Sequence, residues 1–489
     1  MFLGLDLGTS ELKALLLSPS HEVIATAHAP LSVQHPQPLW AEQAPADWWR
    51  ALEDVMGQLQ RAHAPAMAQV QGLGLSGQMH GAVLLGQAGE VLRPAILWND
   101  GRSADQCAQL QRLVPQLSDI TGNLAMPGFT APKLLWVRAN EPELFARTQR
   151  VLLPKDWLRL KLTGEAVSDM SDAAGTLWLD TARRDWSDRM LAACGLNRSH
   201  MPRLVEGSAL SAQVLPQLCA RWGLPAQVAV AGGAGDNAAS AMGLGLVEPG
   251  QGFVSLGTSG VVFVVGERFA PDPAHAVHAF CHAVPQRWHQ MSVMLSAASA
   301  VTWAASRLGY ADEAALLADA ATLTPQQQAQ APMFLPYLSG ERSPHNDPQA
   351  RAAWLGMTAA HTRADLAWAV VEGVSFGLRD GLLTLGGPID NRGLALVGGG
   401  ARSLWWGQVL SDVLGLPLWR PAHAGVAAAM GAARLGWLAA GGDIAEVCRP
   451  VAAASTLQPD RDAHARHLLR HARWRAMYAG AARAPGPAV

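Results

Sequence analysis

Two short motifs in this sequence combine a tight glycine turn with residues that could hold a nucleotide. Residues 5–10 read LDLGTS, and the related motif VSLGTS occupies residues 254–259, near the middle of the chain. Backbone N–H groups in such a turn can bind phosphate oxygens, and the Asp6 carboxylate can bind Mg²⁺ directly or through water. Because Ser255 replaces the acid in the second copy, the pair predicts one metal-binding carboxylate and two phosphate turns around one nucleotide. The alternative is that Asp6 only caps a hairpin turn.

A second acid follows a different glycine-rich segment. Residues 228–237 read VAVAGGAGDN, which predicts a buried strand, a glycine loop and then the polar pair Asp236 and Asn237. Glycines allow a substrate to approach the backbone, and the Asp236 carboxylate could accept a hydroxyl proton during phosphoryl transfer. The alternative is that Asp236 caps a helix that starts at Ala238. The two roles are compatible with each other.

Two further loops are candidates for binding a small polyol. Each follows an apolar run, and they read GQMHG at residues 77–81 and ILWNDGR at residues 96–102. Polar groups beyond strand ends commonly hold small ligands in open α/β sheets. The loops nominate Met79, His80, Trp98 and Asn99 as sugar contacts, although a lone histidine is equally compatible with a packing role.

Residues 398–403 read GGGARS and are expected to join a strand at residues 394–397 to a helix. Three glycines permit the close approach of a flat ring or a ribose, and the helix N-terminus adds partial positive charge. The segment lacks the spacing of the dinucleotide fingerprint, and such triplets also occur in plain turns.

The histidines and cysteines do not predict a metal site. The cluster His275, His278, Cys281, His282 and His289 falls on two expected strands around residues 285–286, and strand alternation sends His278 and Cys281 to opposite faces. The five cysteines are odd in number and widely spaced, which argues against a disulfide framework.

Secondary structure patterns place these motifs in two related halves. Each glycine turn is flanked by apolar runs, so each predicts a strand–turn–strand unit, and the repeat indicates duplication. Residues 48–59 have the spacing of an amphipathic helix, residues 70–75 alternate like a strand, and Trp405, Val409 and Val413 are expected on a buried helix stripe. The predicted fold is α/β, with domains at residues 1–245 and 246–489 and a cleft between them. The Arg- and Ala-rich tail after Leu457 is expected to be a surface helix that frays toward Pro485.

Composition excludes several classes of protein. The 489 residues carry 37 Lys and Arg against 39 Asp and Glu, a net charge of −2, which argues against binding to nucleic acid or to an anionic membrane. None of the lysines follows a glycine, so a Gly-Lys-Ser/Thr phosphate loop is absent. The chain starts without a basic leader and has no apolar stretch that predicts a membrane span, so a cytoplasmic protein is expected.

Taken together, these motifs resemble those of the FGGY carbohydrate kinases. The resemblance rests on the two glycine turns, the Asp236 segment, the glycine triplet, GFTAPKLLW at residues 128–136 and DLAWAVVEG at residues 365–373. Within that family, the two polyol loops and FLPYLSGER at residues 334–342 resemble the branch that acts on D-xylulose. The likeness runs from Met1 to about Leu438.

The resemblance implies two actin-like (ribonuclease H-like) ATPase domains and transfer of the ATP γ-phosphate to the 5-hydroxyl of D-xylulose. It implies Asp236 as proton acceptor, Asp6 as the residue that arranges Mg²⁺ and phosphate, and a sugar site that includes Met79, His80, Trp98, Asn99 and Asn237. The nucleotide contacts it implies are Gly8, Thr9, Ser10, Lys13, Gly257, Thr258, Gly399, Gly400 and Ala401.

Two alternatives stay open. One is another FGGY kinase that acts on ribulose, gluconate or a related polyol. The other is a nucleotide-switched binding protein on the same scaffold, such as a chaperone ATPase or a filament former, although the polar loops after Ser76 and Leu97 suit a small molecule better. The oligomeric state is left open, with a homodimer as one alternative.

Overall fold

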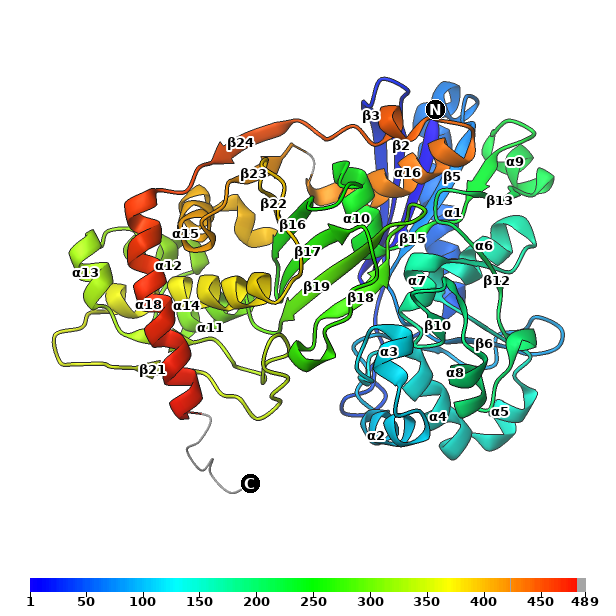
Figure 1. Cartoon of the computed structure of the whole chain (residues 1–489). Coiled ribbons are helices and arrows are strands. Elements are labelled where there is room, and N and C mark those ends of the chain that lie inside the picture. The colour runs from blue at the N-terminus through cyan, green and yellow to red at the C-terminus, as the bar shows by residue number, and fades with distance from the viewer. Residues whose placement is uncertain (423, 482–489) are drawn as a thin grey trace.

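Two seven-stranded sheets form the centres of two lobes in the computed structural model, which describes residues 1–422 and 424–481 (Figure 1). The first sheet has the order β13-β14-β5-β1-β2-β3, with β15 beside β5. Its strands are β1 (Phe2–Leu7), β2 (Glu11–Leu17), β3 (Val23–Pro30), β5 (Gly72–Gly77), β13 (Leu210–Gln213), β14 (Ala229–Ala231) and β15 (Ala234–Gly235). The second sheet has the order β18-β19-β17-β16-β22-β23-β24. Its strands are β16 (Gly252–Leu256), β17 (Gly260–Gly266), β18 (His278–Cys281), β19 (Trp288–Met294), β22 (Leu394–Val397), β23 (Leu418–Pro421) and β24 (Ala453–Leu457).

Both predicted strand–turn–strand units are confirmed. β1 pairs with β2, and β16 pairs with β17, each as an antiparallel hairpin around a glycine turn. In each sheet the first strand of the hairpin also pairs in parallel with a later strand, β5 in the first sheet and β22 in the second. The two halves therefore share one strand arrangement, as the sequence repeat predicted.

Strand register brings the motifs of the first half to one edge of its sheet. Asp6 of β1 lies opposite Ser76 of β5, and Ser76 lies opposite Ala234 of β15. Since all three strands run parallel, their carboxyl ends meet at this edge. Asp236 follows β15 directly as the first residue of α10 (Asp236–Leu244).

Helices cover both sheets, and their buried stripes follow the sequence pattern. The predicted helix at residues 48–59 lies within α1 (Pro45–Met67), which buries Trp48, Leu52 and Val55. The other main helices of the first lobe are α2 (Ala104–Leu113), α4 (Thr130–Asn140), α6 (Pro154–Thr163), α7 (Met170–Ala174) and α9 (Pro216–Trp222). Those of the second lobe include α11 (Ala298–Arg307), α12 (Glu313–Ala320), α14 (Arg363–Leu383), α15 (Leu404–Leu414) and α18 (Arg461–Ala481).

A late helix, α16 (Ala427–Ala439), packs against the first sheet as well as against α10 (Figure 1). Glycines make this approach possible. A Cβ on Gly74 would lie 2.0 Å from the Ala432 carbonyl oxygen, and one on Gly431 would lie 1.8 Å from that of Ala239. Several glycines of this chain thus serve helix contacts rather than turns or ligand contacts.

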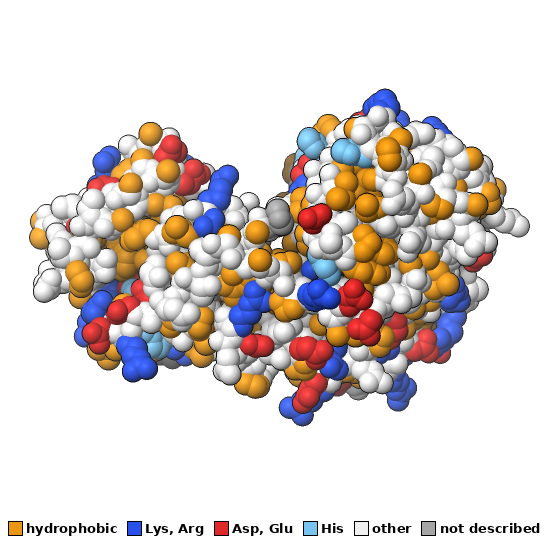
Figure 2. Space-filling model, turned by 90° about the horizontal axis from the view of Figure 1, so that it is seen from above, with side chains coloured by type: hydrophobic (Ala, Val, Ile, Leu, Met, Phe, Trp, Pro, Cys, Tyr) orange, Lys and Arg blue, Asp and Glu red, His pale blue; other side chains and the backbone are white. Residues whose placement is uncertain are grey.

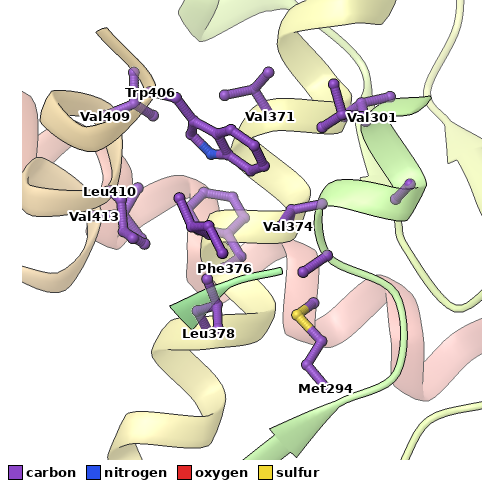
Figure 3. Packing of buried hydrophobic residues seen from close by; sticks show 14 of the residues in the cluster. Met294, Val301, Val371, Val374, Phe376, Leu378, Trp406, Val409, Leu410 and Val413 are labelled. Carbon is purple, nitrogen blue, oxygen red and sulfur yellow. The ribbon is translucent and has the colours of Figure 1, made fainter. Parts of the chain in front are cut away.

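The core of the second lobe forms where α11, α14 and α15 meet (Figure 3). Phe376 and Val374 of α14 pack there with Val409 and Val413 of α15. The expected stripe of α15 is present, but Trp406 is its buried tryptophan and Trp405 is only partly buried, a shift of one residue around the helix.

The tail helix differs from the expected surface helix. α18 packs one face on the second lobe and buries Trp474 completely. Its Arg470 forms an ion pair with the buried Glu372 of α14 at 2.6 Å, and Trp474 Nε1 donates to the Phe334 carbonyl. Burial here depends on paired polar groups, so hydrophobic patterning alone did not reveal the buried face. The predicted fraying toward Pro485 lies outside the described residues.

Side chains link the two lobes along β18 and β19. Asn123 Nδ2 donates to the Ala279 carbonyl at 3.0 Å, His278 Nδ1 donates to Asn123 Oδ1 at 2.8 Å, and Trp288 Nε1 donates to the Thr181 carbonyl at 2.9 Å. Figure 2 shows the surface hollowed between the lobes. The domain division at residue 246 stays a prediction. No helix in residues 1–422 and 424–481 has both the length and the apolar character needed to span a bilayer.

Candidate active site

Asp6 lies at the end of β1 with one defined partner. Ser76 Oγ donates to Asp6 Oδ1 at 2.9 Å. Burial raises the pKa of Asp6 above its usual value, while the Ser76 hydrogen bond and the Lys13 cation lower it in part. Carboxylate oxygens are the ligands that Mg²⁺ prefers, so the residue suits the predicted metal role.

Asp236 begins α10 instead of capping a helix that starts at Ala238. The residue at the cap position is Gly235, and the Asp236 side chain accepts from Asn237 N at 2.7 Å and from Asn237 Nδ2 at 2.9 Å. Burial and the negative charge of Asp6 raise the pKa of Asp236 to about 7. A carboxylate with a pKa near neutrality is suited to accept a proton.

His80 is held in one orientation and one tautomer. Its ring Nδ1 donates to the Gly175 carbonyl at 2.6 Å, so Nε2 is left as an acceptor. Burial, together with the Lys133 and Arg342 cations, lowers the pKa of His80 to about 3, although the hydrogen bond to Gly175 opposes the shift. The residue has a φ of 70°, and Lys133 Nζ donates to its carbonyl at 2.8 Å, which fixes this strained backbone position. A neutral ring with a free Nε2 can accept a hydrogen bond from a hydroxyl.

Met79 connects His80 to the Asp236 segment. The Met79 side chain is buried and lies against Gly235 and Gly175. A Cβ on Gly235 would lie 2.8 Å from this side chain, and a Cβ on Gly175 would lie 2.9 Å from it. The structure therefore brings three of the predicted site residues, Met79, His80 and Asp236, to the same sheet edge.

The second polyol loop is hydrogen-bonded to the first phosphate turn. Trp98 is 49% exposed, and its indole N–H donates to Thr9 Oγ1 at 3.0 Å. It thus links the polyol loop to the first phosphate turn. Asn99 is exposed, and no hydrogen bond of its side chain is found within residues 1–422 and 424–481. Its contact with a sugar stays a prediction.

The first phosphate turn is fixed by a network of amides that the sequence analysis missed. Thr9 Oγ1 donates to Gln78 Oε1 at 3.1 Å, Gln78 Nε2 donates to Gln43 Oε1 at 2.9 Å, and Gln43 Nε2 donates to the Thr9 carbonyl at 2.7 Å. Gly8 N donates to the Glu11 carbonyl at 3.0 Å, and Ser10 is exposed. Gln78 stands inside a motif already singled out, whereas nothing in the sequence marked Gln43.

Lys13 lies opposite Asp6 in the β1–β2 hairpin and reaches toward the second lobe. Its ammonium pairs with Glu11 at 3.1 Å and donates to the Gly425 carbonyl at 3.3 Å. The predicted nucleotide lysine is therefore in a position that joins the first hairpin to the segment before α16.

The second phosphate turn and the glycine triplet lie against each other, as the sequence expectation requires. A Cβ on Gly398 would lie 3.0 Å from Gly257 N, and one on Gly400 would lie 2.9 Å from the Leu256 Cβ. Gly399 has open space at this point, and the neighbouring Ala401 is buried. The Thr258 carbonyl accepts from Ala297 N at 3.0 Å, which ties the turn to the start of α11.

Residues of the second lobe complete the surroundings of His80, and the sequence analysis did not assign them there. Between ring centroids, Phe280 of β18 lies 6.4 Å from His80, and Phe129 of the first lobe lies 4.6 Å from His80 and 5.7 Å from His278. Arg342 donates to His278 Nε2 at 3.2 Å. His278 was considered only as a metal ligand, and its pattern gave no signal of this contact.

One group of acids among the described residues has the spacing of metal ligands, and a lysine already fills it. Asp156, Asp169 and Asp172 surround the Lys155 ammonium at 2.6, 2.7 and 3.2 Å, and all four side chains are fully buried. The cation of Lys155 supplies the charge that a metal would bring.

Comparison with known proteins gives the family. The model of the FGGY family of carbohydrate kinases, N-terminal domain, matches residues 1–243, and that of the C-terminal domain matches residues 252–440. A xylulose kinase of Escherichia coli K12 is 50% identical over 98% of both chains, and one of Klebsiella pneumoniae is 52% identical over 90% of both.

A crystal structure of a "xyloylose kinase" from Brucella ovis has a TM-score of 0.95 and 47% identity, and the match covers 98% of this chain and 99% of that one. This overlap confirms the predicted α/β fold of two actin-like ATPase domains. These matches describe enzymes that transfer a phosphoryl group from ATP to a small sugar. The chain belongs to the FGGY family of carbohydrate kinases.

Proposed function

We propose that this kinase phosphorylates D-xylulose at its 5-hydroxyl, with ATP as donor and Asp236 as general base. The observation that carries the proposal is the position of Asp236 at the sheet edge beside Asp6, Met79 and the neutral His80 ring. The substrate is taken from the relatives, since xylulose kinases are 50% and 52% identical to this chain.

The hydroxyl of the ketose gives its proton to the Asp236 carboxylate while its oxygen attacks the γ-phosphorus in line with the leaving ADP. A base with a pKa near 7 is ionised often enough at neutral pH to accept that proton and basic enough to hold it. His80 Nε2 accepts a hydrogen bond from another hydroxyl, and the Met79 side chain packs against the carbon chain. Positioning of this kind is the main contribution that proteins make to phosphoryl transfer.

The nucleotide spans the two glycine turns. The first turn, with Gly8 and Thr9, and the second, with Gly257 and Thr258, offer backbone N–H groups to the phosphates. Gly399 leaves room for the adenosine, since no side chain occupies the space there, and Gly400 packs beside it against Trp406 and Leu256. Asp6 would hold Mg²⁺, which neutralises phosphate charge when bound, and its carboxylate suits that ion.

Coupled ADP release, measured over D-xylulose, D-ribulose, L-ribulose, D-gluconate and glycerol, tests the substrate. We expect kcat/KM for D-xylulose to exceed that for each other polyol by at least about 10-fold, which corresponds to roughly 1.4 kcal/mol of transition-state discrimination. A higher kcat/KM for another polyol would identify a different FGGY kinase. ATP hydrolysis that no polyol stimulates would favour the nucleotide-switched binding protein.

A further inference from the structure

The short segment from Asp169 to Gly175 touches two groups of the candidate site at once. At its start, Ser171 Oγ accepts from Gly235 N at 3.2 Å, and Gly235 immediately precedes Asp236. At its end, the Gly175 carbonyl accepts from His80 Nδ1 at 2.6 Å. One short stretch of chain thus contacts both the residue before the proposed base and the ring proposed to bind sugar.

Local hydrogen bonds make this segment rigid. Asp169 caps α7, where its Oδ2 accepts from Ser171 N at 2.8 Å, from Asp172 N at 3.2 Å and from Ser171 Oγ at 2.5 Å. The Ser171 hydroxyl hydrogen is therefore directed at Asp169, which leaves its lone pairs for Gly235 N. The orientation of the acceptor is set before substrate binds.

A buried ion cluster fixes the segment to the sheet. The Lys155 ammonium contacts Asp169 at 2.7 Å and Asp172 at 3.2 Å. A Cβ on Gly77, the last residue of β5, would lie 3.0 Å from the Lys155 Cβ, so Lys155 packs closely on the sheet. Burial disfavours the cation, but the acids around it raise the pKa of Lys155. A charged pair without access to water resists displacement, because separating the partners would leave a buried charge unpaired.

Steric contacts add a second constraint at the sugar end. A Cβ on Gly175 would lie 2.7 Å from His80 Nδ1 and 2.9 Å from the Met79 Cε. Gly175 itself has a φ of −73°, which any residue can adopt. The glycine is therefore required by the neighbouring side chains and not by its own backbone.

We propose that residues 169–175 are a positioning element that sets the separation between the Asp236 carboxylate and the His80 ring, with Ser171 as its contact to the base and Gly175 as its contact to the sugar site. This inference rests on the proposed function. Neither residue touches substrate, so both act through their neighbours.

The test compares Ser171→Ala with Ser168→Ala. Ser168 is a buried serine of the preceding strand, β9 (Val167–Asp169), and its hydroxyl has no hydrogen bond partner within residues 1–422 and 424–481, so it is a matched control. We expect Ser171→Ala to lower kcat about 10- to 100-fold with KM for the ketose within about threefold of wild type, because the base moves while the sugar contacts stay. Ser168→Ala should keep a kcat within about twofold of wild type.

Gly175→Ala tests the other contact and stands in if Ser171→Ala does not fold. It should raise KM for the ketose at least about 10-fold with a smaller change in kcat, since it displaces His80 and Met79. A kcat for Ser171→Ala within twofold of wild type, an equal loss in Ser168→Ala, or an unchanged KM in Gly175→Ala would each overturn the inference. A wild-type enzyme that phosphorylates no polyol would overturn the proposed function and this inference together. An active wild type with failed variant predictions would overturn only the inference.

Discussion

The negative charge of Asp6 acts on the buried Asp236, and burial and this charge together raise the pKa of the Asp236 carboxyl to about 7. The two acids come from segments far apart in the sequence. Asp6 of β1 and Ala234 of β15, the strand before Asp236, both lie opposite Ser76 of β5. Ser76 donates its hydroxyl to Asp6 and keeps that carboxylate in place. One acid thus tunes the other, a common arrangement in sites that move protons.

Asp236→Asn should lower kcat by about 10²- to 10⁴-fold, because the amide cannot accept the hydroxyl proton. KM for the ketose should change little, since the shape of the side chain is kept. Steady-state kinetics with coupled ADP release measure both constants. Asp105→Asn, at an exposed acid of α2, should leave both unchanged. A near-normal kcat for Asp236→Asn would rule out the general-base role.

The acid limb of the kcat/KM profile should fall near pH 7, because protonation removes the base. Asp6→Asn should shift that limb to lower pH in its residual activity, since removal of a nearby negative charge lowers the pKa of Asp236. Profiles at saturating Mg–ATP for wild type, Asp6→Asn and Asp105→Asn compare the limbs. A limb that stays near pH 7 in Asp6→Asn would contradict the coupling.

Asp236 should also make the stability of the unliganded protein depend on pH. Its pKa in the folded state, about 7, exceeds the ordinary value of 3.8, so its contribution to stability is largest below the ordinary pKa and is lost as pH rises through 7. Asp236→Asn stays neutral, so its Tm should exceed that of wild type by a larger margin at pH 8 than at pH 5. Thermal unfolding without nucleotide measures the margin, and a margin independent of pH would oppose the prediction.

Arg470→Ala should destabilise the protein by about 3–5 kcal/mol, because it leaves the buried Glu372 carboxylate without its ion pair. Arg473→Ala, at an exposed position of α18, should change stability by less than about 0.5 kcal/mol. Chemical denaturation of both variants gives the difference. Equal effects of the two substitutions would mean that the ion pair does not anchor the helix.

Gly431→Ala should destabilise the protein by at least about 1–3 kcal/mol, since its Cβ would lie 1.8 Å from the Ala239 carbonyl oxygen and must push α16 from α10. Gly57→Ala is the matched control in α1, where the nearest atom is the flexible end of Arg61 at 3.2 Å. That variant should be more stable than wild type by about 0.5–1 kcal/mol. Denaturation midpoints of wild type, Gly431→Ala and Gly57→Ala measure these changes in stability.

The sequence predicted the hairpins, the strand at residues 394–397 and the helix at residues 48–59, because each rests on local apolar patterns that tertiary contacts reinforce. It also nominated Met79, His80 and Asp236, which the fold brings together. The reason is that their loops all follow parallel strands, whose carboxyl ends converge.

Other features depend on contacts between distant segments and had no local signal. Gln43 joins the first phosphate turn from a short strand before α1, and Arg342 contacts His278 across 64 residues of the second lobe. The buried face of α18 uses Arg470 and His467, residue types that read as solvent-facing until Glu372 is known to lie opposite. Such pairings follow from the fold and not from periodicity.

The docking of α16 on the first sheet means that the two parts of the chain are not separable pieces. A fragment that stopped at residue 245 would lose the helix that covers Gly4, Gly72 and Gly74, and it would expose a groove of bare backbone shaped for that helix alone. Attempts to produce the first half by itself should therefore yield an aggregating polypeptide unless residues 427–439 are supplied, either in trans or by circular permutation.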